Sequence, residues 1–402
     1  MILNIRPVLS AIKRNPTGAL LVGIQVSITL AVLVNAAWIV HQRVVKIEQP
    51  AGINTRDTFT IAVSGSSKQF NPAAAAAENL AYLRSLPGVA AATITDGVPL
   101  TGNGGDTELW LQPDQRGRVV GASQISVDTD GLKALDVPLI AGRNFRPDEI
   151  VPYTPGKAQP SASVIIVTQA LAHALFPHGN ALGKTVYGSV PKIIIGIARN
   201  FMGPQLGTPV YDTAVYPVLA GQGNYYMLLV RTQPGRRDAI LRAAKKHIGA
   251  SLRNGVIVYT QTLTRAKQQM DSNNRNVAIL LTLVTALMLA VCCLGIFGLT
   301  TFNVGNRTRQ IGTHRALGAR RRDVVTHFLL ENAIILTGGA LLGTILALVI
   351  GEWLTAHYAL PRLNLAYLLV GIVVLAVVGE LAAWQPARRA ARIPPSVATR
   401  TV

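Results

Sequence analysis

Four long apolar runs set the tightest limit on how this chain can fold. Each run holds about 20 residues or more. At ~1.5 Å per residue, a helix of that length crosses a hydrocarbon core of ~30 Å. We therefore predict a membrane protein with four transmembrane helices, assigned to residues 17–40, 277–303, 331–351 and 364–385.

Composition supports a membrane location. Half of the residues are hydrophobic, only 14% are charged and only 5% are aromatic, which suits close-packed membrane helices better than a large soluble core. A cleaved signal peptide is the alternative for the first run, since Lys13 and Arg14 precede it. The run is longer than the roughly 7–15 residues of a signal peptide's apolar core, so we keep it as a span.

The basic residues are concentrated beside the apolar runs. The formal net charge is +19, and three short flanking segments together hold 13 basic residues against one acid, Asp323. Because positively charged loops stay in the cytoplasm, we expect residues 1–16, 304–330 and 386–402, and hence both termini, to be cytoplasmic. This placement indicates contact with membrane lipid and argues against nucleic-acid binding. The 13 residues are Arg6, Lys13, Arg14, Arg307, Arg309, Arg315, Arg320, Arg321, Arg322, Arg388, Arg389, Arg392 and Arg400.

Residues 41–276 are predicted to form a large α+β extracytoplasmic domain inserted between the first and second spans. Short β-like runs alternate with helical patterns, and Gly and Pro mark the turns, including a surface loop around Pro152, Pro155, Gly156 and Pro160. The expected helices are Pro72–Ser85, Asp128–Leu135, Thr168–Phe176 and Arg236–Ile248, of which the second and third begin with good capping residues. The expected strands are Thr58–Val63, Val89–Thr95, Glu108–Leu111, Val119–Val127, Val164–Val167, Lys192–Ile197, Ala214–Val218, Met227–Arg231 and Val256–Thr260.

A polar stretch, Gln261–Asn276, runs directly into the second span and predicts one long helix. Its polar half would stand above the membrane as a stalk, and His41–Gln49, which continues the first span, is expected to pair with it. The third and fourth spans are joined by a short outer segment, residues 352–363, and are expected to form a helical hairpin.

The segment after the second span carries the most specific pattern in the chain. It reads Arg307-Thr-Arg-Gln-Ile-Gly-Thr-His-Arg-Ala-Leu-Gly-Ala319 and predicts a short helix that Gly318 ends. Ile311 and Leu317 would form an apolar ridge among cations, which suits a protein partner. A positively charged loop on anionic headgroups would explain the arginines but not the Ile-Gly and Ala-Leu-Gly-Ala steps.

This segment resembles the signature of MacB/FtsX-type ABC permeases, an arginine-flanked R-E-I-G-x-x-R-A-L-G-A sequence after the second span. Gln310 stands where the family usually has Glu, which removes one charge. The tail Pro386–Ala398 and the outer stretches Asp136–Arg143 and Val164–Phe176 are also similar to family sequences. The matching residues of the signature are Arg309, Ile311, Gly312, Arg315, Ala316, Leu317, Gly318 and Ala319.

The resemblance implies a non-catalytic permease subunit of an efflux complex in the bacterial inner membrane. Such a subunit forms a dimer with a second copy or a related permease. It would bind a separately encoded ABC ATPase, which carries ATP and magnesium, through the matching residues. ATP hydrolysis would then move the outer domain and drive substrate export. That domain would have two lobes, one inserted at roughly residues 98–217, and a periplasmic adaptor protein and an outer-membrane channel are further candidate partners.

Other candidate sites are weak. The segment Gly179–Thr185 resembles a Walker A loop but is one residue too short and follows a helix, so we interpret it as a turn. The histidines show no metal-ligand spacing, and we expect no bound cofactor and no catalytic residues. Gly339 and Gly343 form a small-x-x-x-small step, expected to pack on the fourth span or on a second copy. Glu380, an acid in the fourth span, is expected to have a structural role.

Two further functions fit the same layout. A membrane-tethered sensor or scaffold would bind an outer ligand and recruit a cytoplasmic protein without turnover. A lipoprotein-releasing permease or a division-type FtsX permease is the nearer alternative, although the outer domain is large for the division type. Co-purification of a nucleotide-binding subunit would distinguish the permeases from the sensor.

Overall fold

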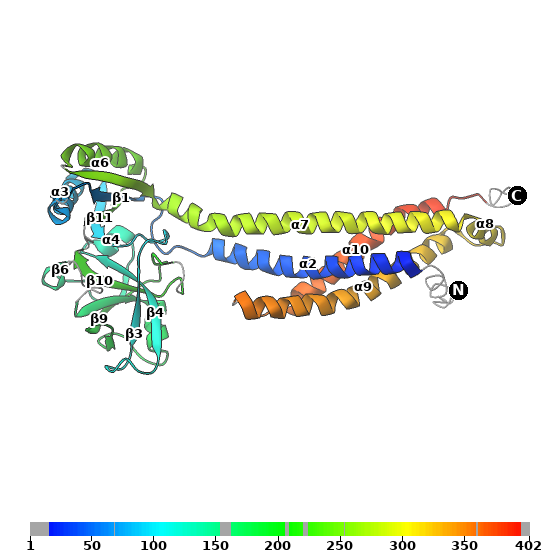
Figure 1. Ribbon diagram of the computed structural model, residues 1–402, viewed down its shortest axis with the longest axis horizontal. Coiled ribbons are helices and arrows are strands. Elements are labelled where there is room, and N and C mark those ends of the chain that lie inside the picture. The colour runs from blue at the N-terminus through cyan, green and yellow to red at the C-terminus, as the bar shows by residue number, and fades with distance from the viewer. Residues whose placement is uncertain are drawn as a thin grey trace. The chain divides into compact units, whose positions relative to one another are not determined.

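The structure is a computed structural model that describes residues 16–67, 69–152, 162–205, 209–219, 224–252, 254–358 and 361–394. The chain divides into two compact units (Figure 1). The helical unit comprises residues 1–48 and 274–402, and the β-rich domain comprises residues 49–273. The predicted surface loop around Pro155, Gly156 and Pro160 lies outside the described residues.

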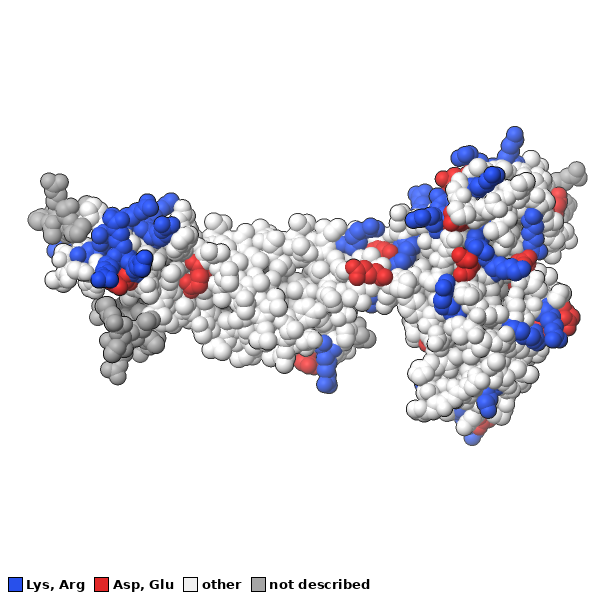
Figure 2. All heavy atoms as spheres, turned by 180° about the vertical axis from the view of Figure 1, so that it is seen from behind, with Lys and Arg blue, Asp and Glu red and all other residues white. Residues whose placement is uncertain are grey.

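Four helices within the described residues are long and apolar enough to cross a membrane. They are α2 (Pro16–Glu48), α7 (Leu263–Asn306), α9 (Arg321–Tyr358) and α10 (Leu365–Ala390). Large apolar side chains such as Leu280, Leu287 and Leu294 point outward along α7, as expected for contact with lipid. Figure 2 shows the middle of this helical unit without charges, whereas Lys and Arg gather at the end where α7 ends and α9 begins. Four membrane helices with a large β-rich domain after the first are therefore present, as predicted.

The long helix predicted to contain the second span is also present. α7 is a single helix whose first turns are polar and whose later turns are apolar, and α2 continues to Glu48. Arg43 Nη1 donates to Asn274 Oδ1 at 2.8 Å, so the extension of the first span pairs with α7. The expected start at Gln261 is slightly early, because Gln261 still belongs to a strand.

One of the two sheets of the β-rich domain is antiparallel. Its described residues form four strands in the order β12-β1-β11-β2. Alternate side chains face opposite sides of the sheet. Phe59, Ile61 and Val63 pack under two helices, whereas Ala62 and Met227 face the second sheet. The strands are β1 (Thr58–Gly65), β2 (Val89–Thr95), β11 (Tyr225–Thr232) and β12 (Gly255–Thr262), and the helices are α3 (Pro72–Ser85) and α6 (Arg237–Ser251).

A second sheet is inserted between β2 and β11, over residues 105–219, close to the lobe predicted at residues 98–217. Its described residues form eight strands in the order β4-β3-β8-β9-β7-β10-β6, with β5 paired to β9. A parallel pairing of β4 with β10 closes the strands from β4 to β10 into a ring, and β6 pairs with β10 outside that ring. The strands are β3 (Gly105–Trp110), β4 (Val119–Val127), β5 (Leu139–Gly142), β6 (Val151–Pro152), β7 (Val164–Thr168), β8 (Thr185–Tyr187), β9 (Pro191–Ala198) and β10 (Thr213–Leu219). Its short helices are α4 (Gly131–Leu135), η1 (Pro147–Glu149) and α5 (Gln169–Leu175).

The capping predictions had different outcomes. Thr168 caps α5, since its Oγ1 accepts a hydrogen bond from Leu171 N at 3.4 Å. The helix expected from Asp128 instead begins at Gly131. The Asp128 side chain accepts from Asp130 N at 2.9 Å and so forms a local turn before α4.

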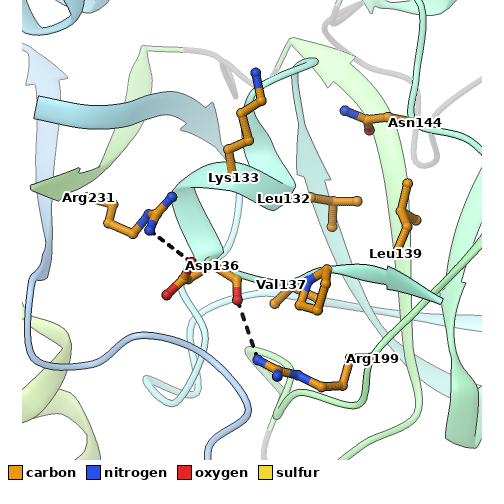
Figure 3. Close-up of a pocket in the computed structure, with 9 residues that line it drawn as sticks. Leu132, Lys133, Asp136, Val137, Leu139, Asn144, Arg199 and Arg231 are labelled. Carbon is orange, nitrogen blue, oxygen red and sulfur yellow. Dashed lines mark hydrogen bonds and ion pairs between the residues drawn. The ribbon is translucent and has the colours of Figure 1, made fainter.

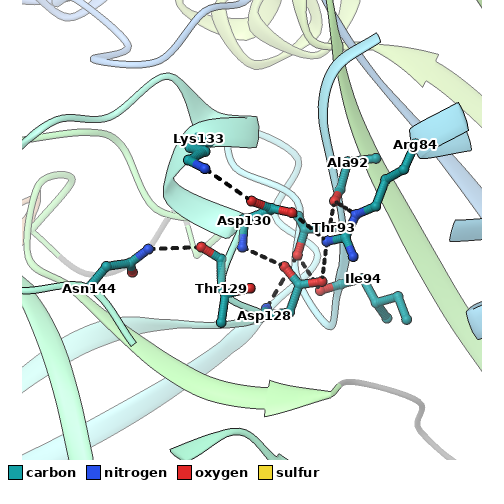
Figure 4. Close-up of polar contacts among 9 residues, drawn as sticks. All are labelled: Arg84, Ala92, Thr93, Ile94, Asp128, Thr129, Asp130, Lys133 and Asn144. Carbon is teal, nitrogen blue, oxygen red and sulfur yellow. Dashed lines mark hydrogen bonds and ion pairs between the residues drawn. The ribbon is translucent and has the colours of Figure 1, made fainter. Parts of the chain in front are cut away.

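The turn before α4 also joins the two sheets through a polar network (Figure 4). Arg84, at the end of α3, bonds to Asp128 at 2.7 Å and to Asp130 at 3.0 Å. The same guanidinium donates to Ala92 O in β2. Because Asp128 is almost fully buried, Arg84 neutralises a carboxylate that would otherwise be costly to bury.

Candidate coupling site

The segment between α7 and α9 contains a short helix, α8 (Thr308–Ala316). Gly318 has a φ of +99°, a left-handed conformation that glycine adopts without strain. Gly318 N donates to Arg315 O at 3.2 Å and Ala319 N donates to His314 O at 3.1 Å. This pair of bonds is a Schellman motif, which explains why a helix of this sequence stops at Leu317.

One face of α8 packs against the ends of α9 and α10. Ile311 and Gly312 are buried, and Ile311 belongs to an apolar cluster with Val324 and Phe328 of α9 and with Ala387 of α10. The predicted ridge of Ile311 and Leu317 is therefore wrong. The two side chains diverge, because Ile311 faces inward while Leu317 lies beyond the last turn and is 82% exposed.

Two arginines hold the segment in place. Arg307 forms a two-pronged ion pair with Glu331 of α9, at 2.8 and 3.2 Å, and Glu331 is only 4% exposed. Arg315 Nη1 donates to Ala391 O and Ile393 O, at 3.1 and 2.7 Å, where α10 ends. A cation at the C-terminus of a helix satisfies carbonyl groups that have no partner within the helix.

The Arg307–Glu331 pair was missed by the sequence reasoning. Its signal is Glu331 itself, an acid at the start of an apolar span that needs a cation nearby. Arg315, by contrast, was assigned to partner contact but serves an internal contact. The segment from Arg307 to Ala319 thus contains residues that fix it to α9 and α10 and other residues that are exposed.

The exposed face of the segment combines one apolar side chain with cations and no described acid other than Asp323. Leu317, Ala316 and Arg309 are exposed, as is Gln310. Asp323 Oδ2 accepts from Arg320 N at 2.9 Å, so it caps α9 and is not available to a partner at that oxygen. The exposed arginines beside Leu317 are Arg309, Arg320, Arg321 and Arg322.

Gly339 and Gly343 lie in a different contact from those expected. A Cβ at Gly339 would come within 2.8 Å of Gly23 O, and one at Gly343 within 2.8 Å of Ser27 O. Both glycines therefore pack against α2, the first span, and the predicted packing on the fourth span is wrong. The close approach of a neighbouring helix, expected at this step, is thus made by α2 within the same chain.

Polar side chains of the first span complete this contact. Ser27 Oγ donates to Gly339 O at 2.9 Å, and Asn35 Nδ2 donates to Ala347 O at 3.1 Å. The sequence separation is 312 in both pairs, so α2 and α9 run parallel and in register. Glu380 of α10 accepts a hydrogen bond from Asn332 Nδ2 of α9 at 3.3 Å, in line with the structural role expected for it.

No group of three or more His, Cys, Asp or Glu within the described ranges is arranged to hold a metal ion. The Walker-like segment Gly179–Thr185 leads from α5 directly into β8. Gly183 has a φ of +78° there, which is typical of a turn.

Two family models match the chain. The MacB-like periplasmic core domain matches residues 18–247, more than half of the chain, and the FtsX-like permease C-terminal model matches residues 282–395. The first region runs from the first span through most of the β-rich domain, and the second contains α8 and the last two spans.

Several named proteins are similar in sequence. The macrolide export ATP-binding/permease protein MacB of Escherichia coli K12 is 27% identical over 391 residues, which cover 94% of this chain and 56% of that protein. MacB of Chromobacterium violaceum is 27% identical over 294 residues, covering 69% and 43%. The probable syringafactin export ATP-binding/permease protein SyfD of Pseudomonas syringae pv. tomato is 26% identical over 386 residues, covering 93% and 55%. The chain thus spans about half the length of these relatives.

Solved structures show a weaker likeness. The periplasmic region of MacB from Actinobacillus actinomycetemcomitans matches with a TM-score of 0.34 and 15% identity, over 56% of this chain and 98% of that one. The extracellular domain of the transporter YknZ from Gram-positive bacteria matches with a TM-score of 0.32 and 14% identity, over 50% and 100%. The family assignment rests on the two family models.

Proposed function

Because this chain belongs to the MacB/FtsX family of ABC transporter permeases, a family of multi-pass inner-membrane proteins, we propose that it is the permease subunit of an export complex driven by a separate ATPase subunit. In this proposal both termini and α8 are cytoplasmic, and the ATPase supplies the ATP and magnesium. The permease works as a dimer, with itself or with a related chain. A periplasmic adaptor and an outer-membrane channel are candidate further partners on the opposite side.

One observation carries the proposal. Leu317 is a large apolar side chain that is 82% exposed, yet the helix before it is fixed to α9 and α10 by Ile311 and Arg315. An aliphatic side chain on a rigid support can anchor a protein interface, and the exposed arginines of the same segment add residues of a type that is enriched at interfaces. A contact with lipid headgroups alone would require the arginines but not an exposed leucine on a rigid support.

The proposed motion uses the helices that continue out of the membrane. ATPase subunits that bind α8 shift α7 and α9 as they close on ATP. α7 is one helix from Leu263 to Asn306, and Arg43 links it to α2, so both helices transmit this shift to the β-rich domain. Substrate is then moved on the outer side of the membrane.

The test is the substitution Leu317→Asp. The side chain has few contacts to lose within the chain, so folding is retained, whereas a partner would lose a buried leucine worth about 1.5–3 kcal/mol. That energy corresponds to a loss of affinity of roughly tenfold to a hundredfold. We expect that at least tenfold less ATPase activity co-purifies with the variant than with the wild type in mild detergent.

Thr326→Asp is the matched control, because Thr326 is exposed on α9 and the substitution adds the same charge. It should leave the co-purifying activity unchanged. Equal ATPase activity with Leu317→Asp and Thr326→Asp would refute the docking assignment. Absence of any ATPase from the wild-type preparation would favour the sensor or scaffold instead.

A further inference from the structure

The β-rich domain has a pocket at the seam between its two sheets. Its volume is about 500 Å³, within the range of pockets that hold small molecules. The lining comes from α4, from the segment that enters β5, and from the ends of β9 and β11 (Figure 3). A ligand there would contact both sheets of the domain.

The pocket is basic. Lys133, Arg199 and Arg231 line it together with one carboxylate, Asp136. In Figure 3 the two arginines reach Asp136 from opposite sides. Arg231 Nη1 donates to Asp136 Oδ1 at 2.8 Å, which neutralises that carboxylate. Two of the three cations are therefore not balanced by an acid of the lining.

Arg199 is the cation best placed to receive a ligand. Its side chain is exposed, and its hydrogen bond within the described residues is a long one of 3.5 Å from Nη2 to Asp136 O. Most of its five donors are thus open to a second partner. Lys133 is 3.5 Å from Asp130, a residue that already binds Arg84 at 3.0 Å, so its charge is only partly compensated.

Apart from Asn144, the rest of the lining is apolar. Leu132 and Val137 line the pocket but are buried, so the open apolar surface comes from Pro138, which is exposed, and Leu139, which is half-buried. Asp136 places these side chains around the cations because it adopts a left-handed conformation, with φ +63° and ψ +35°, at the end of α4. The pocket therefore offers a guanidinium fork and an apolar surface side by side.

We propose that this pocket binds a carboxylate that is attached to an apolar group. A guanidinium binds a carboxylate through two parallel hydrogen bonds, and Pro138 and Leu139, the apolar lining residues that are not buried, cover the adjoining apolar part of the ligand. Two sources carry this chemistry, the C-terminus of a peptide that ends in an apolar residue and the head of a short acyl chain. This site is separate from the proposed ATPase contact and does not depend on it.

The test measures binding to the full chain in lipid nanodiscs by calorimetry, without nucleotide and with empty nanodiscs subtracted. N-acetyl-leucine represents the peptide terminus, octanoate the acyl chain, and N-acetyl-leucinamide lacks the charge. We expect one of the two carboxylates to bind at millimolar concentration or below, and the amide to bind at least tenfold more weakly, because it lacks charge-assisted hydrogen bonds. Whichever carboxylate binds more tightly identifies the source.

The variant Arg199→Gln should weaken binding of that carboxylate tenfold or more, and Arg199→Lys should restore part of it. Lys245→Gln, on an exposed position of α6, is the matched control and should bind as the wild type does. The proposal is overturned if neither carboxylate binds at millimolar concentration, if the amide binds equally well, or if Arg199→Gln leaves the affinity unchanged. Equal binding of inorganic phosphate would overturn the apolar part of the assignment.

Discussion

At the scale of single residues, the β-rich domain contains a cation in an unfavourable position. Lys192 is only 1% exposed, and its ammonium donates to Val190 O at 3.0 Å and lies 5.9 Å from the centre of the Tyr216 ring. No carboxylate among the described residues forms an ion pair with it. Burial therefore lowers the pKa of Lys192 to about 8.

This pKa predicts how stability changes with pH. Between about 8 and the ordinary value of 10.5, the unfolded chain holds the proton while the folded chain has lost it. The free energy of unfolding therefore rises with pH in this window, by about 1.4 kcal/mol per unit. Between pH 8 and 9.5 the expected gain is roughly 2 kcal/mol. Below pH 8 the gain is absent.

The measurement can use Trp110 fluorescence during thermal unfolding, with Trp38, Trp353 and Trp384 replaced by Phe so that the β-rich domain alone reports. Lys192→Met removes the titrating group and should abolish the rise. The upper limit of pH 9.5 matters because burial also raises the pKa of Tyr216, to about 12, which lowers stability above pH 10. An identical slope in both proteins would show that Lys192 is not the source.

At the scale of elements, the closest contact among the spans joins α2 to α9. Gly339 and Gly343 let the two backbones approach, and Ser27 and Asn35 bond across the contact. Small residues and interhelical hydrogen bonds of this kind hold membrane helices together where no hydrophobic effect acts between them. The α2–α9 pair is therefore held together both by close packing and by hydrogen bonds.

Gly343→Ala should separate this pair. Its Cβ would lie 2.8 Å from Ser27 O, which is backbone and cannot move aside alone, so we expect a loss of about 1–3 kcal/mol. Gly338→Ala is the matched control on the same helix, since a Cβ at Gly338 meets nothing within 4 Å. Ala favours a helix over Gly by about 1 kcal/mol, so the control should be neutral or stabilising. Unfolding by SDS in mixed micelles measures both, and equal changes would contradict the packing.

The sequence predicted the elements better than their contacts. The four spans follow from length and hydropathy, and β2 and β4 have the predicted ends because their β-branched runs are bounded by turn residues. The sequence also predicted a close helix approach at Gly339 and Gly343 in α9. It did not predict that α2 is the approaching helix, because a small residue indicates a close approach without indicating which helix makes it. Ser27 and Asn35 were the available signal, two polar side chains spaced for one face of the first span.

The missed elements share a physical cause. β5, β6 and β8 have two to four residues, too few for a periodic pattern, and they exist because longer strands pair with them. Asp128 was mistaken for a helix cap because its side chain can accept from a nearby N–H either in a cap or in a turn. In the folded protein Asp128 also binds Arg84, a residue 44 positions away. The local sequence around Asp128 does not reveal this contact.

At the scale of the whole molecule, α7 is the element that belongs to both units, since the division between them falls at Asn273 and Asn274. A continuous helix transmits force because each turn is bonded to the next. Asn276→Pro would remove one of these bonds and clash with the preceding turn, at a local cost of about 3 kcal/mol. Asn276 is exposed, so Asn276→Ala is a control that keeps the helix intact.

We expect Asn276→Pro to uncouple the two units without disturbing either. ATPase co-purification should be unchanged, because α8 and its anchors, Ile311, Arg315 and the Arg307–Glu331 pair, are distant in the chain from the substitution. Hydrogen exchange measured by mass spectrometry should show an ATP-dependent change in the β-rich domain of the wild type and of Asn276→Ala, but not of Asn276→Pro. If the change persists with proline, transmission does not depend on the continuity of α7, and the Arg43 contact from α2 becomes the element to test.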